Sequence, residues 1–256
     1  MRGMSVPGGP ELLDTWEAGQ AASDADRGLL LHALARPSLD RSRLLSTPVG
    51  SRDADLLTLR ALLFGELAQV RLRCSGCAED LEFALDIRQL LTGDGPAEDA
   101  GEPAEDMGEP IEVALGEWIV RFRLPTAADL LAVGQSAPAE ARSLLMERCV
   151  VTVARDAQPA SAADLPAEVQ EKLAEAMAQA DPDADLRLDA PCPACGHHTS
   201  AIVDAASFLW AELDAWARGT LLEVHLLAST YGWTEPEVLA LSPRRRRHYL
   251  ELAGHA

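Results

Sequence analysis

The sequence predicts an α+β protein that is mainly helical and centred on a zinc-ribbon-like pair of β-hairpins. Two Cys-x-x-Cys pairs, Cys74/Cys77 and Cys192/Cys195, lie far apart in the chain. Apolar and polar residues alternate on both sides of each pair, which is the period of a strand. Elsewhere, and above all in the C-terminal quarter, apolar residues recur at helical spacing. With 256 residues and 48% hydrophobic residues, the chain is long and apolar enough for a core.

The N-terminal part is predicted to be helical. Apolar residues at helical spacing indicate helices over Glu11–Ala18 and Asp24–Ala35, and Pro37 ends the second. A polar stretch follows. We expect the next helix to begin with Ser51 as its N-cap and to end at Gly65 as its C-cap.

Each cysteine pair is predicted to lie in the turn of a hairpin. The apolar residues that alternate with polar ones around the two pairs are Val70, Leu72, Leu81, Phe83, Leu85, Leu186, Leu188, Ala201 and Val203. The two units form a weak internal repeat. We interpret them as two hairpins that share one ion.

The segment between the hairpins is predicted to hold a further hairpin, Ile111–Ala114 with Trp118–Leu124. Helices are expected to follow over Thr126–Val133, Pro138–Ala154 and Pro166–Ala180. This segment would then be a subdomain inserted between the two cysteine pairs.

The C-terminal quarter predicts three helices. A long helix starts near Ala205 and carries apolar residues as far as Leu227. Thr234, with a glutamate three residues later, forms a capping box, and Ser242 before Pro243 is the cap of a last helix.

We therefore divide the chain into five segments. Residues 94–110 carry seven acidic and no basic residues, with frequent glycine and proline, which predicts an acidic disordered linker. The others are an N-terminal helical arm (1–50), a helix with the first knuckle hairpin (51–93), an inserted hairpin and helical subdomain (111–185), and the second knuckle hairpin with the C-terminal helices (186–256).

The four paired cysteines predict a structural zinc site. Four thiolates fill a tetrahedral shell and leave no position for substrate, so the site would stabilise architecture. One alternative is that the two pairs are unrelated turns with free thiols. The other is a redox-active pair, but such a pair lies between a strand and a helix and occurs as a single Cys-x-x-Cys motif. His197 and His198 follow the second pair, and we expect them to face solvent or the outer shell of the site.

No catalytic motif is found. Glu212, Asp214, Glu223 and His225 lack the spacing of a nucleophile, base and orienting group, and Cys149 in an apolar stretch indicates a buried, inert thiol. No phosphate-binding loop or nucleophile elbow is present in the sequence. We expect neither enzymatic activity nor a small-molecule substrate.

The formal net charge of −19 argues against nucleic acids and anionic membranes as partners. No stretch of sequence is long and apolar enough to span a bilayer, and no secretory signal is visible. Cysteines in the pattern of metal ligands fit a reducing compartment, so we expect a cytoplasmic protein.

Two features near the C-terminus are candidates for partner binding. The basic run is either a solvated or internally paired helix face, or a docking patch for an acidic partner. Its arginines are Arg244, Arg245, Arg246 and Arg247. Tyr231 and Trp233 lie in a turn between helices and either mark a binding surface or staple the turn, whereas core packing is expected for Trp210 and Trp216.

Several of these motifs, in this order, resemble the baseplate hub assembly chaperones of contractile-tailed phages, in the version found in gene clusters for extracellular contractile injection systems. The resemblance covers roughly Leu56 to Leu252. Its motifs are Leu62–Gly65, Cys74–Cys77 with Leu81–Phe83, Arg123–Thr126 with Asp129–Leu130, Cys192–His197, Ser207–Trp210 with Asp214–Trp216, Tyr231–Glu235 and Leu241–Arg244.

This resemblance implies a non-enzymatic assembly factor that binds baseplate hub or wedge proteins. The four paired cysteines map onto the family's metal knuckles, and the resemblance supplies no catalytic residues. Three alternatives stay open: a permanent structural baseplate component, a zinc-ribbon regulator that binds nucleic acid, and a metal-dependent hydrolase with an open coordination position.

Overall fold

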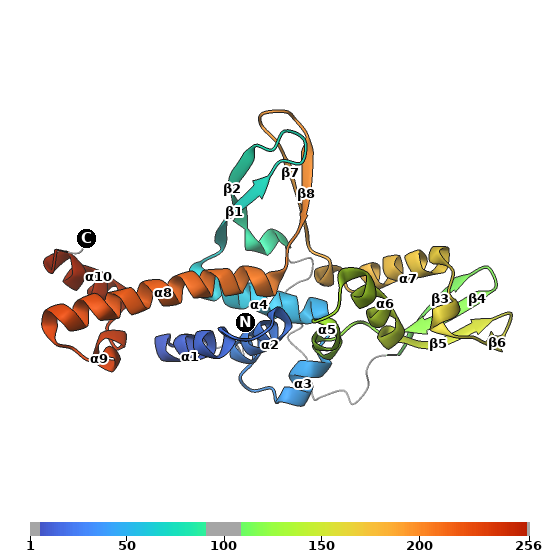
Figure 1. The fold of residues 1–256 in the computed structure, drawn as a ribbon, viewed down its shortest axis with the longest axis horizontal. Coiled ribbons are helices and arrows are strands. Elements are labelled where there is room, and N and C mark those ends of the chain that lie inside the picture. The colour runs from blue at the N-terminus through green and yellow to red at the C-terminus, as the bar shows by residue number, and fades with distance from the viewer. Residues whose placement is uncertain (1–5, 91–108, 255–256) are drawn as a thin grey trace.

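Helices and small antiparallel sheets make up the computed structural model, which describes residues 6–90 and 109–254 (Figure 1). This confirms the α+β prediction and the two hairpins. The predicted acidic linker lies outside the described residues, apart from Glu109 and Pro110 at its end.

The body is a layer of helices around one core. Its helices are α1 (Gly9–Gly19), α2 (Asp24–Ala35), α3 (Arg41–Ser46), α4 (Val49–Phe64) and the first half of α8 (Ala205–Tyr231). Leucines at helical spacing on α2, α4 and α8 face one another, and Leu31, Leu56, Leu57 and Leu213 are almost inaccessible to solvent. Burial of such side chains contributes about 1.5–3 kcal/mol each.

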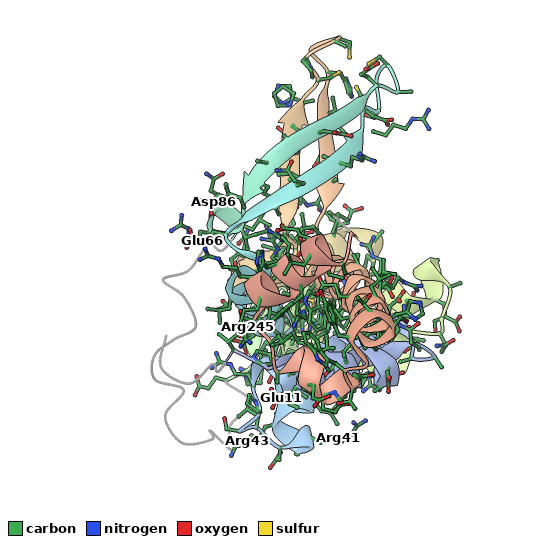
Figure 2. The ribbon with its side chains drawn as sticks, turned by 90° about the vertical axis from the view of Figure 1, so that its left-hand side faces the viewer. Glu11, Arg41, Arg43, Glu66, Asp86 and Arg245 are labelled. Atoms are coloured by element: carbon green, nitrogen blue, oxygen red, sulfur yellow. The ribbon has the colours of Figure 1, made fainter. Side chains whose placement is uncertain are left out.

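Two hairpins stand side by side and project from this body (Figures 1 and 2). The first joins β1 (Leu67–Arg73) to β2 (Asp80–Asp86), and the second joins β7 (Arg187–Pro191) to β8 (His198–Ile202). Ala68, Leu85 and Leu186 at their bases belong to the body core. A 3₁₀ turn, η1 (Ile87–Leu90), follows β2.

The inserted segment has its own sheet and its own core. The strands pair in the order β3 (Ile111–Leu115), β4 (Trp118–Phe122), β5 (Val150–Arg155) and β6 (Gln158–Pro159). The other elements are α5 (Ala127–Val133), α6 (Pro138–Cys149), η2 (Ala162–Asp164), α7 (Ala167–Ala180) and η3 (Pro182–Ala184). Leu173 of α7 packs against Trp118, Val120 and Phe122 on one face of the sheet.

The predicted helix over Pro138–Ala154 is wrong in its last turn. It ends at Cys149, and Val150–Arg155 forms β5 beside β4. The run of β-branched residues from Val150 to Val153 favours a strand, and the open edge of β4 supplies its partner.

The start of α4 also differs from the prediction. Pro48, not Ser51, is the N-cap, because the Val49 amide donates to the Pro125 carbonyl and Pro48 bridges to Thr126. Contact with the inserted segment therefore sets this helix start. The polar stretch before it holds the short helix α3, which the side chain of Asp40 caps. Gly65 is the C-cap as predicted.

The C-terminal helices form a small lobe at the far end of α8 (Figure 1). α9 (Glu235–Leu239) and α10 (Pro243–Leu252) pack on α8 through Val238 and Leu250. The predicted capping box at Thr234 and cap at Ser242 are both present. Within the described residues, no helix, α8 included, combines the length and apolar character needed to cross a bilayer.

Candidate metal centre

The two cysteine pairs occupy matching turns at the tips of the projecting hairpins. In the first, the Cys74 amide donates to the Glu79 carbonyl at 2.8 Å, and the Ala78 amide donates to the Cys74 carbonyl at 2.9 Å. In the second, the Cys192 amide donates to His197 at 2.9 Å, and the Gly196 amide donates to Cys192 at 2.8 Å. The residue after the second cysteine of each pair has a positive φ, 62° at Ala78 and 73° at Gly196.

The turns bring the four sulfur atoms together although the two pairs lie 115 or more positions apart in sequence. Cys74 Sγ lies 3.7 Å from Cys195 Sγ, and Cys77 Sγ lies 3.7 Å from Cys192 Sγ. All four sulfurs lie within 4.8 Å of one another. A tetrahedron of sulfurs about 2.3 Å from a central zinc ion has edges of about 3.8 Å, so the spacing fits such a metal site.

Burial of the site is asymmetric. Cys74 and Cys192 are buried above Leu81, with Leu72 and Phe83 packed around them. Cys77 and Cys195 are exposed at the outer end. Cys74 and Cys192 are therefore held in place by apolar packing of the hairpins, whereas Cys77 and Cys195 form the side from which an ion would enter.

The electrostatics of the cluster call for a cation. The Cys77 amide and then the Gly76 amide, whose nitrogen lies 3.3 Å from Cys74 Sγ, lower the pKa of Cys74 to about 6. The Glu79 amide acts in the same direction on Cys77, but the neighbouring sulfurs, Cys195 first, raise the pKa of Cys77 to about 12. Four thiolates cannot form this close together without a positive ion to balance them.

The neighbouring polar groups hold the knuckles against each other. The Ser75 amide donates to Thr199 Oγ1 at 3.2 Å, which joins the first turn to β8. The ring of His197 lies over Gly76, where a Cβ atom would come within 3.0 Å of it. His198 is exposed, and its Nδ1 lies 2.9 Å from Asp189 Oδ2, so neither histidine is among the clustered ligands.

A buried ion pair connects the base of the first hairpin to α8. Arg60, at the end of α4, donates from Nε and Nη2 to the two carboxylate oxygens of Glu212, each at 2.7 Å. Its Nη2 also donates to the carbonyl of Leu67, the first residue of β1, at 3.2 Å. Arg60 is 2% exposed, so this contact fixes how the hairpin leaves the body.

The basic run on α10 is divided between the interior and the surface. Arg246 is buried and donates from Nε to Glu223 Oε2 at 2.7 Å and from Nη1 to the Leu241 carbonyl. Arg244, Arg245 and Arg247 are exposed. Of the four arginines, Arg246 thus has the internal ion pair that the sequence analysis considered, and its side chain is not available to bind another protein.

The aromatic residues of the C-terminal lobe form a cluster. Tyr231 stacks on Trp233 with ring centroids 4.7 Å apart, and both rings contact the edge or face of Tyr249. The Tyr231 hydroxyl donates to the Tyr249 carbonyl. These rings staple α8 to α10, while Trp210 and Trp216 pack against the body core.

Sequence analysis did not find the charged groups that fix the body and the insert. Asp55 accepts hydrogen bonds from Arg36 and lies 3.2 Å from His32. Asp129 accepts from Arg123 and Arg148; burial acts against ionisation, but these bonds and those from Thr126 hold its pKa well below the usual range. His32 and Arg36 lie 19 or more positions from Asp55, and Arg148 lies 19 from Asp129, so no periodic signal marks these pairs. Arg123 is only six positions from Asp129, but the pattern of residues there does not predict the bond.

The metal site and its hairpins lie within a region that matches a known family. A family model described as T4 bacteriophage base plate protein matches residues 35–210. The chain belongs to this family. A search of curated proteins and a search of solved structures each found no match.

The matched region of this baseplate protein runs from the end of α2, through both hairpins and the insert, to the first residues of α8. Both cysteine pairs lie inside it. The C-terminal lobe, with its aromatic cluster and its basic run, lies beyond it.

Proposed function

We propose that this baseplate protein is a non-enzymatic assembly factor, a chaperone for the baseplate of a phage-like contractile injection system, and that its cysteine cluster holds a structural zinc ion. The match of residues 35–210 to a baseplate family carries the proposal. Its direct partners are then hub or wedge proteins, and it acts in the cytoplasm, where such particles are built.

The donor set together with its spacing favours a single zinc ion over a cluster of several irons. Four thiolates in tetrahedral arrangement are typical of structural zinc and of iron–sulfur proteins. The S···S distances of 3.7 Å match a single central ion, because a cluster of several irons holds its cysteines farther apart. X-ray absorption with four sulfur neighbours supports the zinc assignment, whereas an oxygen neighbour favours the hydrolase alternative.

The mechanical role of the metal follows from its place. It joins two hairpins that project from the body, and each two-stranded hairpin alone is marginally stable in water. With the metal bound, the arm formed by the two hairpins, β1–β2 and β7–β8, is rigid and presents a fixed shape to other baseplate proteins. Such an arm orients partners and has no need of a reaction centre.

Deleting the gene in its native host tests the assembly role. We expect loss of assembled baseplates and of complete particles by electron microscopy, with restoration by a plasmid copy. Unchanged assembly would contradict the proposal. Mass spectrometry of purified mature particles then separates the two baseplate roles: absence of the chain indicates a chaperone, and its presence a permanent subunit, which the family description also fits.

A further inference from the structure

We propose that the exposed face of α10, formed by Arg244, Arg245, Arg247 and Leu252, is a docking surface for an acidic, amphipathic segment of a partner protein. The inference rests on the assembly role proposed above, since the partner is then a baseplate protein. The surface lies outside the region that matches the family, so the match gives no information about it.

One face of α10 is fixed to the lobe and the other is free. Arg246 and Leu250, one turn apart, point inward to Glu223 and to the core of the lobe. The remaining arginines and Leu252, which is 67% exposed, point outward. The aromatic cluster behind the helix holds this outer face in place, so little backbone conformational freedom is lost when a partner binds.

The three outer arginines have no carboxylate partner among the described residues, although the chain carries a net charge of −19. Most other arginines of the described chain are ion-paired; the exceptions outside α10 are Arg41, Arg43, Arg73 and Arg142. These cations also stand at the start of a helix, where the dipole opposes them. The unfavourable interaction of these cations with the helix dipole is offset when an anionic group of another molecule binds to them.

The chemistry of the face defines its occupant. Arg244 and Arg247 are three residues apart, so their Cβ atoms lie about 5–6 Å from each other on one side of the helix. Arginine forks pair with carboxylates in a bidentate geometry, so two acidic side chains at similar spacing fit them. Leu252 lies seven residues, about two turns, beyond Arg245, on the same edge of this face, and supplies an apolar contact.

A protein segment fits this face better than nucleic acid does. Glu235 on α9 and Glu251 on α10 are exposed in the same lobe, and they repel a phosphate backbone, which is charged at every unit, more than a protein segment with two spaced carboxylates. The rings of Tyr231, Trp233 and Tyr249 are packed against one another, which leaves no open platform for base stacking.

The first test is charge reversal in the native host. The variant Arg244→Glu/Arg245→Glu/Arg247→Glu should fold, because glutamate is favourable in the first turns of a helix. Its matched control is Arg41→Glu/Arg43→Glu/Arg142→Glu, which makes the same change in net charge on α3 and α6. Figure 2 shows Arg41 and Arg43 well away from Arg245.

In a strain that lacks the chromosomal gene, we expect the control variant to restore baseplates and the α10 variant to lower their number at least tenfold. If both variants restore assembly equally, the docking surface is wrong while the assembly role stands. If the deletion strain assembles baseplates normally, the assembly role fails, and the second test alone decides the docking surface.

The second test measures binding to a defined probe by fluorescence anisotropy. The probe is a helical peptide with glutamates three residues apart and a leucine two turns away; its control has glutamine in place of glutamate. We expect the α10 variant to bind the acidic peptide at least tenfold more weakly than the wild type and the control variant, roughly the loss of two ion pairs together with the repulsion that charge reversal adds. Equal affinity for all proteins would overturn the proposal. So would binding of a thymidine oligonucleotide as tight as that of the acidic peptide and equally lost in the α10 variant.

Discussion

Metal removal should disorder the tips of the two hairpins and leave the helical body folded. Apart from the two buried cysteines, the apolar cluster at the tip consists of Leu81, which is fully buried, with Leu72 and Phe83 partly buried. Their burial contributes about 4–6 kcal/mol in total. Fixing the twelve residues of the two turns, 74–79 and 192–197, costs about 1 kcal/mol or more per residue. Structural zinc contributes about 10–16 kcal/mol and closes this gap.

Hydrogen exchange read by mass spectrometry measures the effect directly. With a strong chelator present, peptides that cover 70–83 and 188–201 should exchange rapidly, while peptides from α4 and the first half of α8 keep their protection. The body has its own core of almost inaccessible leucines, so it does not depend on the ion.

Cysteine variants supply the control. Cys77 is exposed, so Cys77→Ser removes a ligand with little loss of packing and should lower the metal content below one ion per chain. Cys149 is 1% exposed and lies outside the cluster, and burial raises the pKa of its thiol to about 11, so Cys149→Ser should keep the metal. Full protection of both tips after complete metal removal would refute the reasoning.

Three further predictions concern the turns, the hairpin base and pH. Gly196→Ala places a side chain at a φ of 73° and should destabilise the second cysteine turn by about 1 kcal/mol. Ala78→Gly removes the same backbone strain from the first turn and should stabilise it. The chelator concentration that removes half of the metal should therefore fall in the first variant and rise in the second. Glu212→Ala leaves Arg60 buried without its carboxylate partner and should lower the free energy of unfolding by about 3 kcal/mol. Urea denaturation measures this change. An unchanged urea midpoint would contradict the role of the ion pair. Burial raises the pKa of Asp53 to about 6, so between pH 4 and pH 7 the native state holds a proton that the unfolded chain has released. Asp53 therefore contributes about 2–3 kcal/mol of stability at pH 4 that is lost by pH 7. Urea melts of wild type and Asp53→Asn at several pH values should differ by this amount across the range, and a constant difference would contradict the pKa shift.

The local part of the structure could be predicted because local residues determine it. A Cys-x-x-Cys turn between alternating strands, a glycine at Gly65 and a capping box at Thr234 each depend on neighbours within a few residues. The meeting of the two knuckles was also predictable, since one tetrahedral ion needs four ligands and each turn supplies two.

Errors arose where distant contacts determine the local structure. Val150 is helical by spacing but becomes a strand residue because β4 offers it a partner. The start of α4 is moved from Ser51 to Pro48 by a hydrogen bond to Pro125 of the insert. The pair of Arg60 with Glu212 joins residues 152 positions apart, and nothing in either neighbourhood signals the other.

The shared sulfur cluster has a consequence for how this protein can change over evolution. The sulfurs of Cys77 and Cys192 lie 3.7 Å apart although the two residues are 115 positions apart in sequence. The entropy of closing a loop rises only slowly with its length, by about 0.6 kcal/mol for each doubling. The sheet β3–β6, which has its own core, therefore departs from and returns to one end of the hairpin pair, so homologues can lengthen or shorten it. The parts of the insert that contact α4, at Thr126 and Asp181, are tied to the geometry of the helical body.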